Sequence, residues 1–92
     1  MPRARNEALI AAFADELSAA RVSIAMSQEE LAHRAGVDRT FIWLLETGRR
    51  QPTISVLFAL AAGLNISPEA FVERVRRAMR IPPIAAHGGV RS

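Results

Sequence analysis

Arginine is the residue type with the most chemistry to offer in this sequence. All twelve basic residues are arginine and none is lysine. The planar guanidinium group presents a fork of donors that matches a phosphate or the edge of a guanine. A GC-rich coding sequence would also favour arginine and the seventeen alanines, so both explanations stay open. The positions of the arginines must therefore decide whether they bind anything.

Other reactive constellations are missing from the sequence. Without cysteine there is no disulfide framework, thiol nucleophile or cysteine-ligated zinc. His33 and His87 do not stand at metal-ligand spacing from each other or from carboxylates. The acidic pairs at 15–16 and 29–30 fit helix surfaces better than acid–base catalysis, and no glycine-rich phosphate loop occurs. We expect no enzyme activity, no cofactor, no metal and no small-molecule ligand.

Length and composition predict one small globular domain. The chain has 92 residues, of which 50% are hydrophobic and 23% charged. Residues 8–26 are largely apolar, but Asp15, Glu16 and Arg21 interrupt them too soon for a membrane span. Acidic residues rather than a hydrophobic signal region follow the arginine-rich start. We expect a soluble, cytoplasmic protein with no membrane partner.

Helical periodicity runs through the sequence, and no alternating apolar and polar stretch predicts a strand. The fold class expected is all-α, a compact five-helix bundle. The helices are expected at about 7–22, 28–35, 39–47, 54–64 and 68–79, after the N-caps Asn6, Ser27, Asp38, Thr53 and Ser67. Residues 1–6 then form an N-terminal arm, residues 7–80 the domain, and residues 81–92 a flexible C-terminal tail.

The second and third helices are joined by a tight turn and predict a helix-turn-helix at about 28–47. Ser27 and Glu30 form a capping box at its start. Gly36 permits the left-handed turn, and Ile42 with Leu45 anchors the third helix to the core. An ordinary helical pair in a small bundle would show similar spacing, so the pattern needs independent support.

That support comes from a resemblance that covers about residues 9–75. The stretch SQEELAHRAGVDRTFIWLLETGRRQPTISVLFALAAGLNISPEAF resembles the lambda-repressor-like (Xre-type) helix-turn-helix family. Its matching motifs are the opening Ser27, Gln28, Leu31 and Ala32, the turn 35–37, the closing 46–48, and the segment from Pro52 through Ser67. The fragment DRTFI is also similar to restriction–modification controller proteins. The resemblance implies a sequence-specific, DNA-binding transcriptional regulator.

The resemblance also implies roles for particular residues. Gln28, at the start of the second helix, corresponds to a residue that bonds a backbone phosphate beside the helix N-terminus. The third helix would lie in the major groove, as in phage repressors. Arg39 and Thr40 match positions that reach base edges, where arginine can pair with guanine O6 and N7. Arg49 and Arg50 match phosphate-contacting positions in the following loop.

A second implied pair is structural. Arg21 and Glu46 match residues that form an internal salt bridge between the first and third helices in this family.

Trp43 and Leu44 depart from the polar residues that the family usually carries in the third helix. Ile42 and Leu45 point inward, so the helical period places Trp43 and Leu44 outward. They could contact thymine methyl groups, bind a protein partner, or be partly buried against the first helix or the N-terminal arm. The second possibility defines an alternative function, a protein-interaction module on the same fold, such as an antitoxin or partner-binding regulator.

The fourth helix is apolar nearly all round, which favours burial on two faces. Val56, Ala59 and Ala62 stand where relatives carry polar residues, and Val72 and Val75 could extend the patch. Alanine-rich drift on an exposed face is the alternative explanation. We expect a homodimeric repressor or controller whose partners are double-stranded DNA and a second copy. Its two-fold symmetry would match an inverted-repeat operator with half-sites about 10 bp, or a multiple of that, apart.

Overall fold

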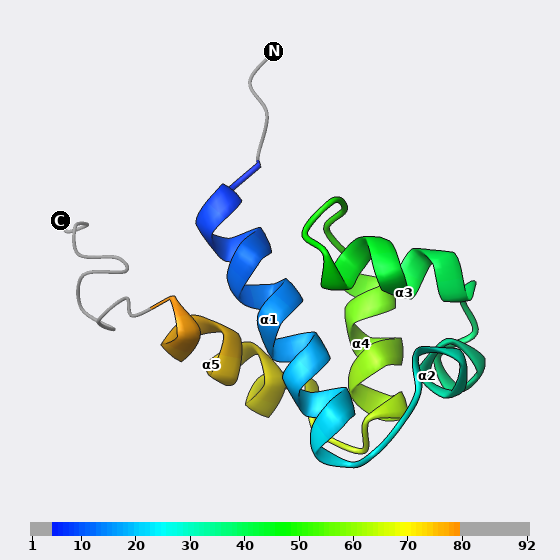
Figure 1. Ribbon diagram of the computed structural model, residues 1–92. Helices are drawn as coiled ribbons and strands as arrows, with labels where there is room; N and C mark the ends of the chain where they lie inside the picture. The colour runs from blue at the N-terminus through cyan, green and yellow to red at the C-terminus, as the bar shows by residue number, and fades with distance from the viewer. Residues whose placement is uncertain (1–4, 80–92) are drawn as a thin grey trace, which may run out of the picture.

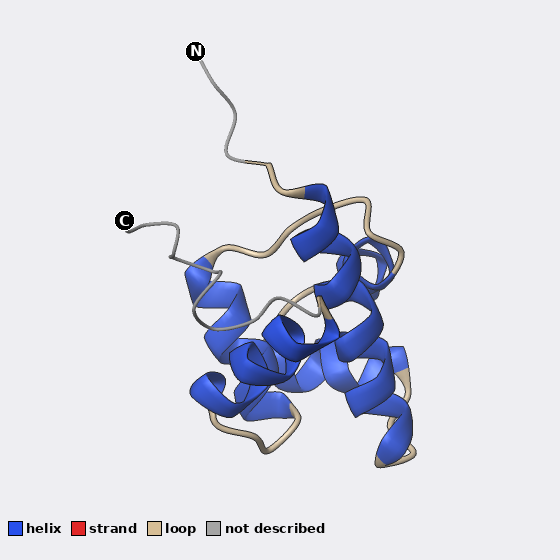
Figure 2. Ribbon diagram, turned by 90° about the vertical axis from the view of Figure 1, so that its left-hand side faces the viewer, coloured by secondary structure: helices blue, strands red, loops and turns tan. Residues whose placement is uncertain are grey.

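Five helices make up the part of the chain that the computed structural model describes, residues 5–79. They are α1 (Glu7–Ser23), α2 (Gln28–Ala35), α3 (Arg39–Glu46), α4 (Ile54–Gly63) and α5 (Pro68–Ala78). Figures 1 and 2 show helices joined by short loops, with no strand between residues 5 and 79. The expected all-α class is therefore confirmed. The expected C-terminal tail, which includes His87, lies outside the described residues. Most of the expected N-terminal arm lies outside them as well.

Side-chain caps explain where most of the helices begin. In four helices the N-cap side chain accepts a hydrogen bond from the backbone N–H three residues later. These caps are Asn6, Ser27, Thr53 and Ser67. Asp38 takes the N-cap position of α3, but its side chain makes no capping hydrogen bond. Glu30 accepts a hydrogen bond from Arg34 at 3.0 Å, which ties the first turn of α2 to its last.

The turns between helices depend on four residues with positive φ. Gly36 (φ 72°) and Gly48 (φ 75°) end α2 and α3 at the places where the sequence supplies a residue without a Cβ. Ala25 (φ 55°) and Asn65 (φ 63°) adopt the same left-handed conformation after α1 and α4. Asparagine tolerates this region, whereas alanine adopts it at a cost of roughly 1–2 kcal/mol. The turn between α1 and α2 is therefore the strained one.

The core forms where the helices cross. Helix α1 packs against α3 and α5, α2 against α3 and α4, and α4 against α5. Phe13 and Phe71 meet edge to face, with ring centroids 5.6 Å apart and planes at 75°. The largest fully buried side chains are Leu17, Leu31, Ile42, Leu45, Leu60 and Phe71. Because Ile42 and Leu45 bury one face of α3 in the core, the opposite face of this helix is left for solvent or a partner.

Helix α2 lies very close to α4 at a single glycine. A Cβ built on Gly63 would lie 3.1 Å from Leu31 Cδ1 and 3.3 Å from Arg34 Cβ. Ala32, also on α2, is 4% exposed, as its small side chain predicts for a close helix crossing. Small residues thus set the depth at which α2 sits and, through α2, the position of α3.

No single helix between residues 5 and 79 is long and apolar enough to cross a membrane. Helices α4 and α5 meet the requirement only as a pair, and that pair is bent by 102°.

Candidate nucleic-acid interface

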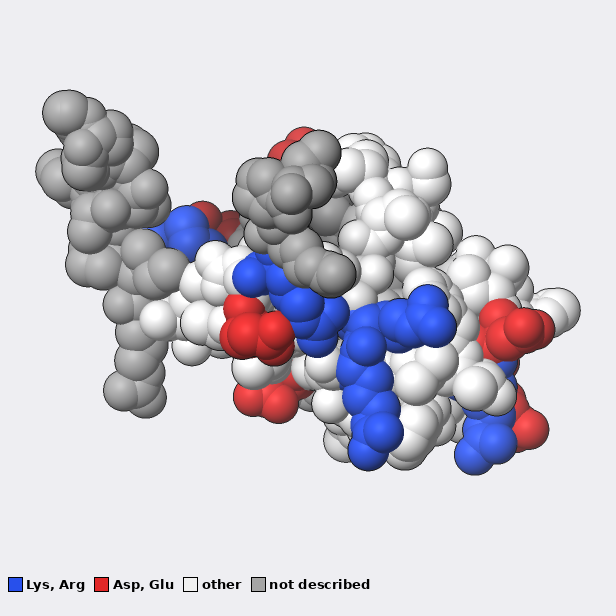
Figure 3. Space-filling view, turned by 90° about the horizontal axis from the view of Figure 1, so that it is seen from above, with Lys and Arg blue, Asp and Glu red and all other residues white. Residues whose placement is uncertain are grey.

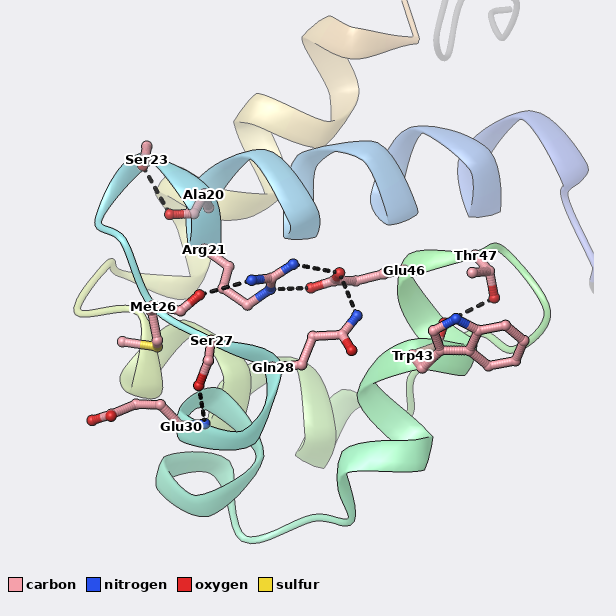
Figure 4. A network of polar contacts seen from close by, with 10 residues as sticks. All are labelled: Ala20, Arg21, Ser23, Met26, Ser27, Gln28, Glu30, Trp43, Glu46 and Thr47. Atoms are coloured by element: carbon pink, nitrogen blue, oxygen red, sulfur yellow. Dashed lines mark hydrogen bonds and ion pairs between the residues drawn. The ribbon is translucent and has the colours of Figure 1, made fainter.

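A nearly buried ion pair fixes α3 to α1. Arg21 Nε lies 2.6 Å from Glu46 Oε2, and Arg21 Nη2 lies 2.9 Å from Glu46 Oε1 (Figure 4). The two side chains are 14% and 6% exposed. Arg21 Nη1 also donates to the backbone oxygen of Met26 at 2.7 Å, which holds the loop before α2. The hydrogen bonds to Glu46 raise the pKa of Arg21, although its burial opposes the shift. The ion pair implied by the resemblance is present.

Gln28 joins this network from the first turn of α2. Its Nε2 donates to Glu46 Oε1 at 3.0 Å, so the carboxylate receives three donors, two from Arg21 and one from Gln28 (Figure 4). The bond fixes the orientation of the Gln28 amide and leaves its second N–H and its carbonyl oxygen available. This link between α2 and α3 was not foreseen from the sequence, because the partners are eighteen positions apart.

The outer face of α3 carries the side chains expected to read bases. Arg39 and Thr40 are exposed, Trp43 is 43% exposed, and Leu44 is half-buried, whereas Ile42 is fully buried. Trp43 thus points outward as the helical period predicts, and Leu44 lies at the edge of the face.

Trp43 has a cationic neighbour that sequence reasoning did not find. The guanidinium carbon of Arg49 lies over the indole ring, 5.1 Å from its centroid. This is the geometry of a cation–π interaction. The chain can return over α3 because Gly48 adopts a left-handed conformation, and Thr47 Oγ1 donates to the backbone oxygen of Trp43 at 2.8 Å. A tryptophan followed by an arginine six residues later, across a glycine, was the signal available.

Pairing with carboxylates separates the described arginines into two groups. Six of the nine arginines between residues 5 and 79 form ion pairs with glutamates. These pairs are Arg5–Glu7, Arg21–Glu46, Arg34–Glu30, Arg74–Glu16, Arg76–Glu73 and Arg77–Glu73. Within the described residues the structure gives the other three, Arg39, Arg49 and Arg50, no ion pair with a carboxylate. They belong to α3 and the loop that follows it.

Figure 3 shows basic side chains gathered on one face of the molecule, with uncharged residues on one side of them and acidic residues on the other. Positive charge that is not neutralised within the protein is available to phosphates. The arginines of α5 are in a different situation, because Arg76 and Arg77 both form an ion pair with Glu73. The hydrogen bond from Arg76 is the main reason that the pKa of Glu73 is lowered.

Comparison with known proteins identifies the family to which this chain belongs. Residues 17–71, more than half of the chain, match the helix-turn-helix family. The chain belongs to the lambda-repressor-like helix-turn-helix family. As a member of this family it is a DNA-binding transcriptional regulator.

Solved structures of the family include similar proteins. The restriction–modification controller protein C.AhdI from Aeromonas hydrophila is 31% identical, with a TM-score of 0.66 over 67% of this chain and 94% of that one. The controller protein C.Esp1396I, solved as a tetramer in complex with its natural 35 base-pair operator, is 29% identical. Its TM-score is 0.74 over 78% of this chain and 95% of that one.

A curated member of the family matches a shorter segment. The helix-turn-helix-type transcriptional regulator y4dJ of Sinorhizobium fredii is 40% identical over 42 residues. The match covers 46% of this chain and 54% of the relative, so it spans about half the length of that regulator.

The five residues that the sequence analysis assigned to a dimer interface do not all lie on the surface. Ala62 and Val72 are exposed, Val56 and Ala59 are half-buried, and Val75 is 4% exposed. Assigning Val75 to a dimer interface was wrong, because this side chain faces inward and belongs to the hydrophobic core.

The large exposed apolar side chains of α4 and α5 are Ile54 (71%), Phe58 (55%) and Val72 (48%). They line a hollow of about 640 Å³ between the two helices. We call Ile54, Phe58 and Val72 the α4–α5 face. Two of its three residues were missed, because a helix that is apolar nearly all round gives no periodic signal for its outward side.

Proposed function

We propose that this protein is a homodimeric repressor or controller that reads an inverted-repeat operator with α3 in the major groove. The observation that carries the proposal is the placement of Arg39, Arg49 and Arg50. These arginines, which no carboxylate pairs with in the described chain, lie together on α3 and its following loop. The similarity to C.Esp1396I, a controller solved on its operator, supports the same assignment.

Each side chain on this surface then has a defined task. Arg39 and Thr40, in the first turn of α3, reach base edges, and Arg39 pairs with a guanine. Arg49 and Arg50 contact phosphates on one side of the groove. Gln28 donates its second N–H to a phosphate near the N-terminus of α2.

The buried ion pair also serves this contact. A bare Glu46 carboxylate would repel a phosphate that approaches Gln28. Arg21 cancels that charge through two hydrogen bonds, so the site that faces DNA has a neutral support.

The test compares arginines that form no ion pair with a carboxylate in the described chain with an arginine that forms one. A duplex selected from a random-sequence pool by the purified protein serves as probe. Arg39→Ala should relax discrimination at one base position per half-site by about tenfold or more. Arg49→Ala should weaken binding to all duplexes alike and lower the slope of log Kd against log salt by about one. Arg34→Ala is the matched control, because Arg34 is exposed but paired with Glu30.

Two outcomes would contradict the assignment. One is that Arg39→Ala and Arg49→Ala behave alike in both specificity and salt slope. The other is that Arg34→Ala weakens binding as much as Arg49→Ala does.

A second copy of the chain is the occupant that we assign to the α4–α5 face. Two recognition helices are needed because one reads too few base pairs, and a contiguous apolar patch is the usual sign of such an interface. C.Esp1396I, solved as a tetramer, is a precedent for assembly in a similar protein. The interface then centres on Phe58, with Ile54 and Val72 beside it and Ala62 at its border.

A further inference from the structure

Trp43 stands at the edge of a small hollow on the outer face of α3. The hollow has a volume of about 210 Å³ and is lined by Arg39, Thr40 and Trp43. These residues share one side of the helix, since positions three and four apart are neighbours on a helix surface. The indole of Trp43, which is 43% exposed, is the one aromatic group in this lining.

The charges around this hollow restrict what can fill it. Arg39 lines it, and Arg49 lies against the indole, 5.1 Å from the ring centroid. An apolar protein partner would have to desolvate two cations that have no carboxylate to offset them. A suitable ligand must bring an apolar group and negative charge together. The major groove offers this combination, because thymine methyl groups lie there between two rows of phosphates.

We propose that this hollow binds the 5-methyl group of a thymine, with the Trp43 indole as its apolar wall. The inference rests on the proposed function, with α3 in the major groove.

The geometry also limits where the thymine lies. The Cβ atoms of residues four apart on a helix are about 5–6 Å apart, and successive bases on one strand rise by about 3.4 Å. Trp43 therefore reads a thymine within about two base pairs of the guanine that Arg39 reads. Each half-site contains one such thymine.

Replacement of thymine by uracil tests this contact, because it removes the methyl group and keeps every hydrogen-bonding atom. The probes are the duplex that the protein selects and its variants with a single dT→dU change. Wild-type protein should lose about fourfold in affinity at one thymine per half-site, the value of one buried methyl group. The other thymines serve as internal controls and should show no change.

The Trp43→Ala variant should bind the thymine and uracil duplexes equally, and Trp43→Phe should keep part of the difference. Trp43 is exposed, so neither variant removes core packing. The proposal is overturned if wild-type protein ignores the uracil change at every position, or if Trp43→Ala keeps the full fourfold ratio. Failure of the wild-type protein to select any duplex would instead overturn the proposed function, and the inference with it.

Discussion

Arg21 and Arg39 carry the same side chain, yet their surroundings give them opposite tasks. Arg21 is 14% exposed and donates to Glu46 and to the backbone of Met26, so it holds α1, α2 and α3 together. Arg39 is exposed, and no carboxylate pairs with it in the described chain. The resemblance implied both roles. Residue type alone could not separate them, because the separation depends on which glutamates come within reach after folding.

The Arg21–Glu46 pair gives a stability prediction at the residue scale. Arg21→Met leaves a nearly buried carboxylate with Gln28 as its remaining partner, and breaking such a pair costs about 3–5 kcal/mol. The double variant Arg21→Met/Glu46→Leu removes both charges and should cost clearly less than the sum of the two single variants. Urea unfolding of the four proteins measures the coupling. Strictly additive losses would show that the pair contributes nothing as a unit.

At the scale of the elements, the start of each helix was the feature most accurately predicted. Asn6, Ser27, Thr53 and Ser67 all cap the helices that follow them, because capping depends on a few neighbouring residues. Asp38 shows the limit of this reasoning. Its residue type and position are right for a cap, but its side chain takes a direction that no local pattern encodes.

The outward face of α4 was the feature least accurately predicted. Ile54 and Phe58 could not be distinguished from core residues by type, and Val75 was placed outside although it lies in the core. The network of Gln28 and the stacking of Arg49 on Trp43 were missed for a related reason. Both depend on the tertiary position of side chains, which residue spacing does not give.

Strain in the turn after α1 gives a prediction at this scale. Ala25 has a φ of 55°, so Ala25→Gly should stabilise the protein by about 1 kcal/mol. The control is Ala19→Gly, an exposed position within α1, which should destabilise it by about the same amount. Thermal unfolding distinguishes the two. A fall in Tm for both variants would show that the Ala25 conformation carries no strain.

For the whole molecule, the location of charge is more informative than its sum. The formal net charge is +3, which argues little for DNA binding. Each described arginine of α5 forms an ion pair with a glutamate, whereas Arg39, Arg49 and Arg50 form none within the described residues. The α4–α5 face, which consists of Ile54, Phe58 and Val72, provides a second surface, and this one is apolar. In the proposed assembly one surface would face DNA and the other a second copy, as a two-fold symmetric reader of an inverted repeat requires.

The assembly gives the prediction at this scale. Phe58→Glu places a charge at the centre of the α4–α5 face and should convert the dimer to a monomer in sedimentation analysis. Binding to the inverted repeat should weaken at least tenfold, while a single half-site is bound as before. Val22→Glu is the control, since Val22 is equally apolar and 61% exposed at the end of α1. A monomeric wild-type protein, or dissociation by Val22→Glu as well, would contradict the assigned interface.

The fluorescence of Trp43 tests the central claim, that the outer face of α3 contacts DNA, most directly. Trp43 is the single tryptophan of the chain, so its emission reports on this face alone. In a titration with the selected duplex, the emission should change and saturate at the concentration where a gel shift is complete, whereas a scrambled duplex should give neither signal. An unchanged emission throughout the titration, with no shifted band for any duplex, would contradict the account and favour a protein-interaction role for this face.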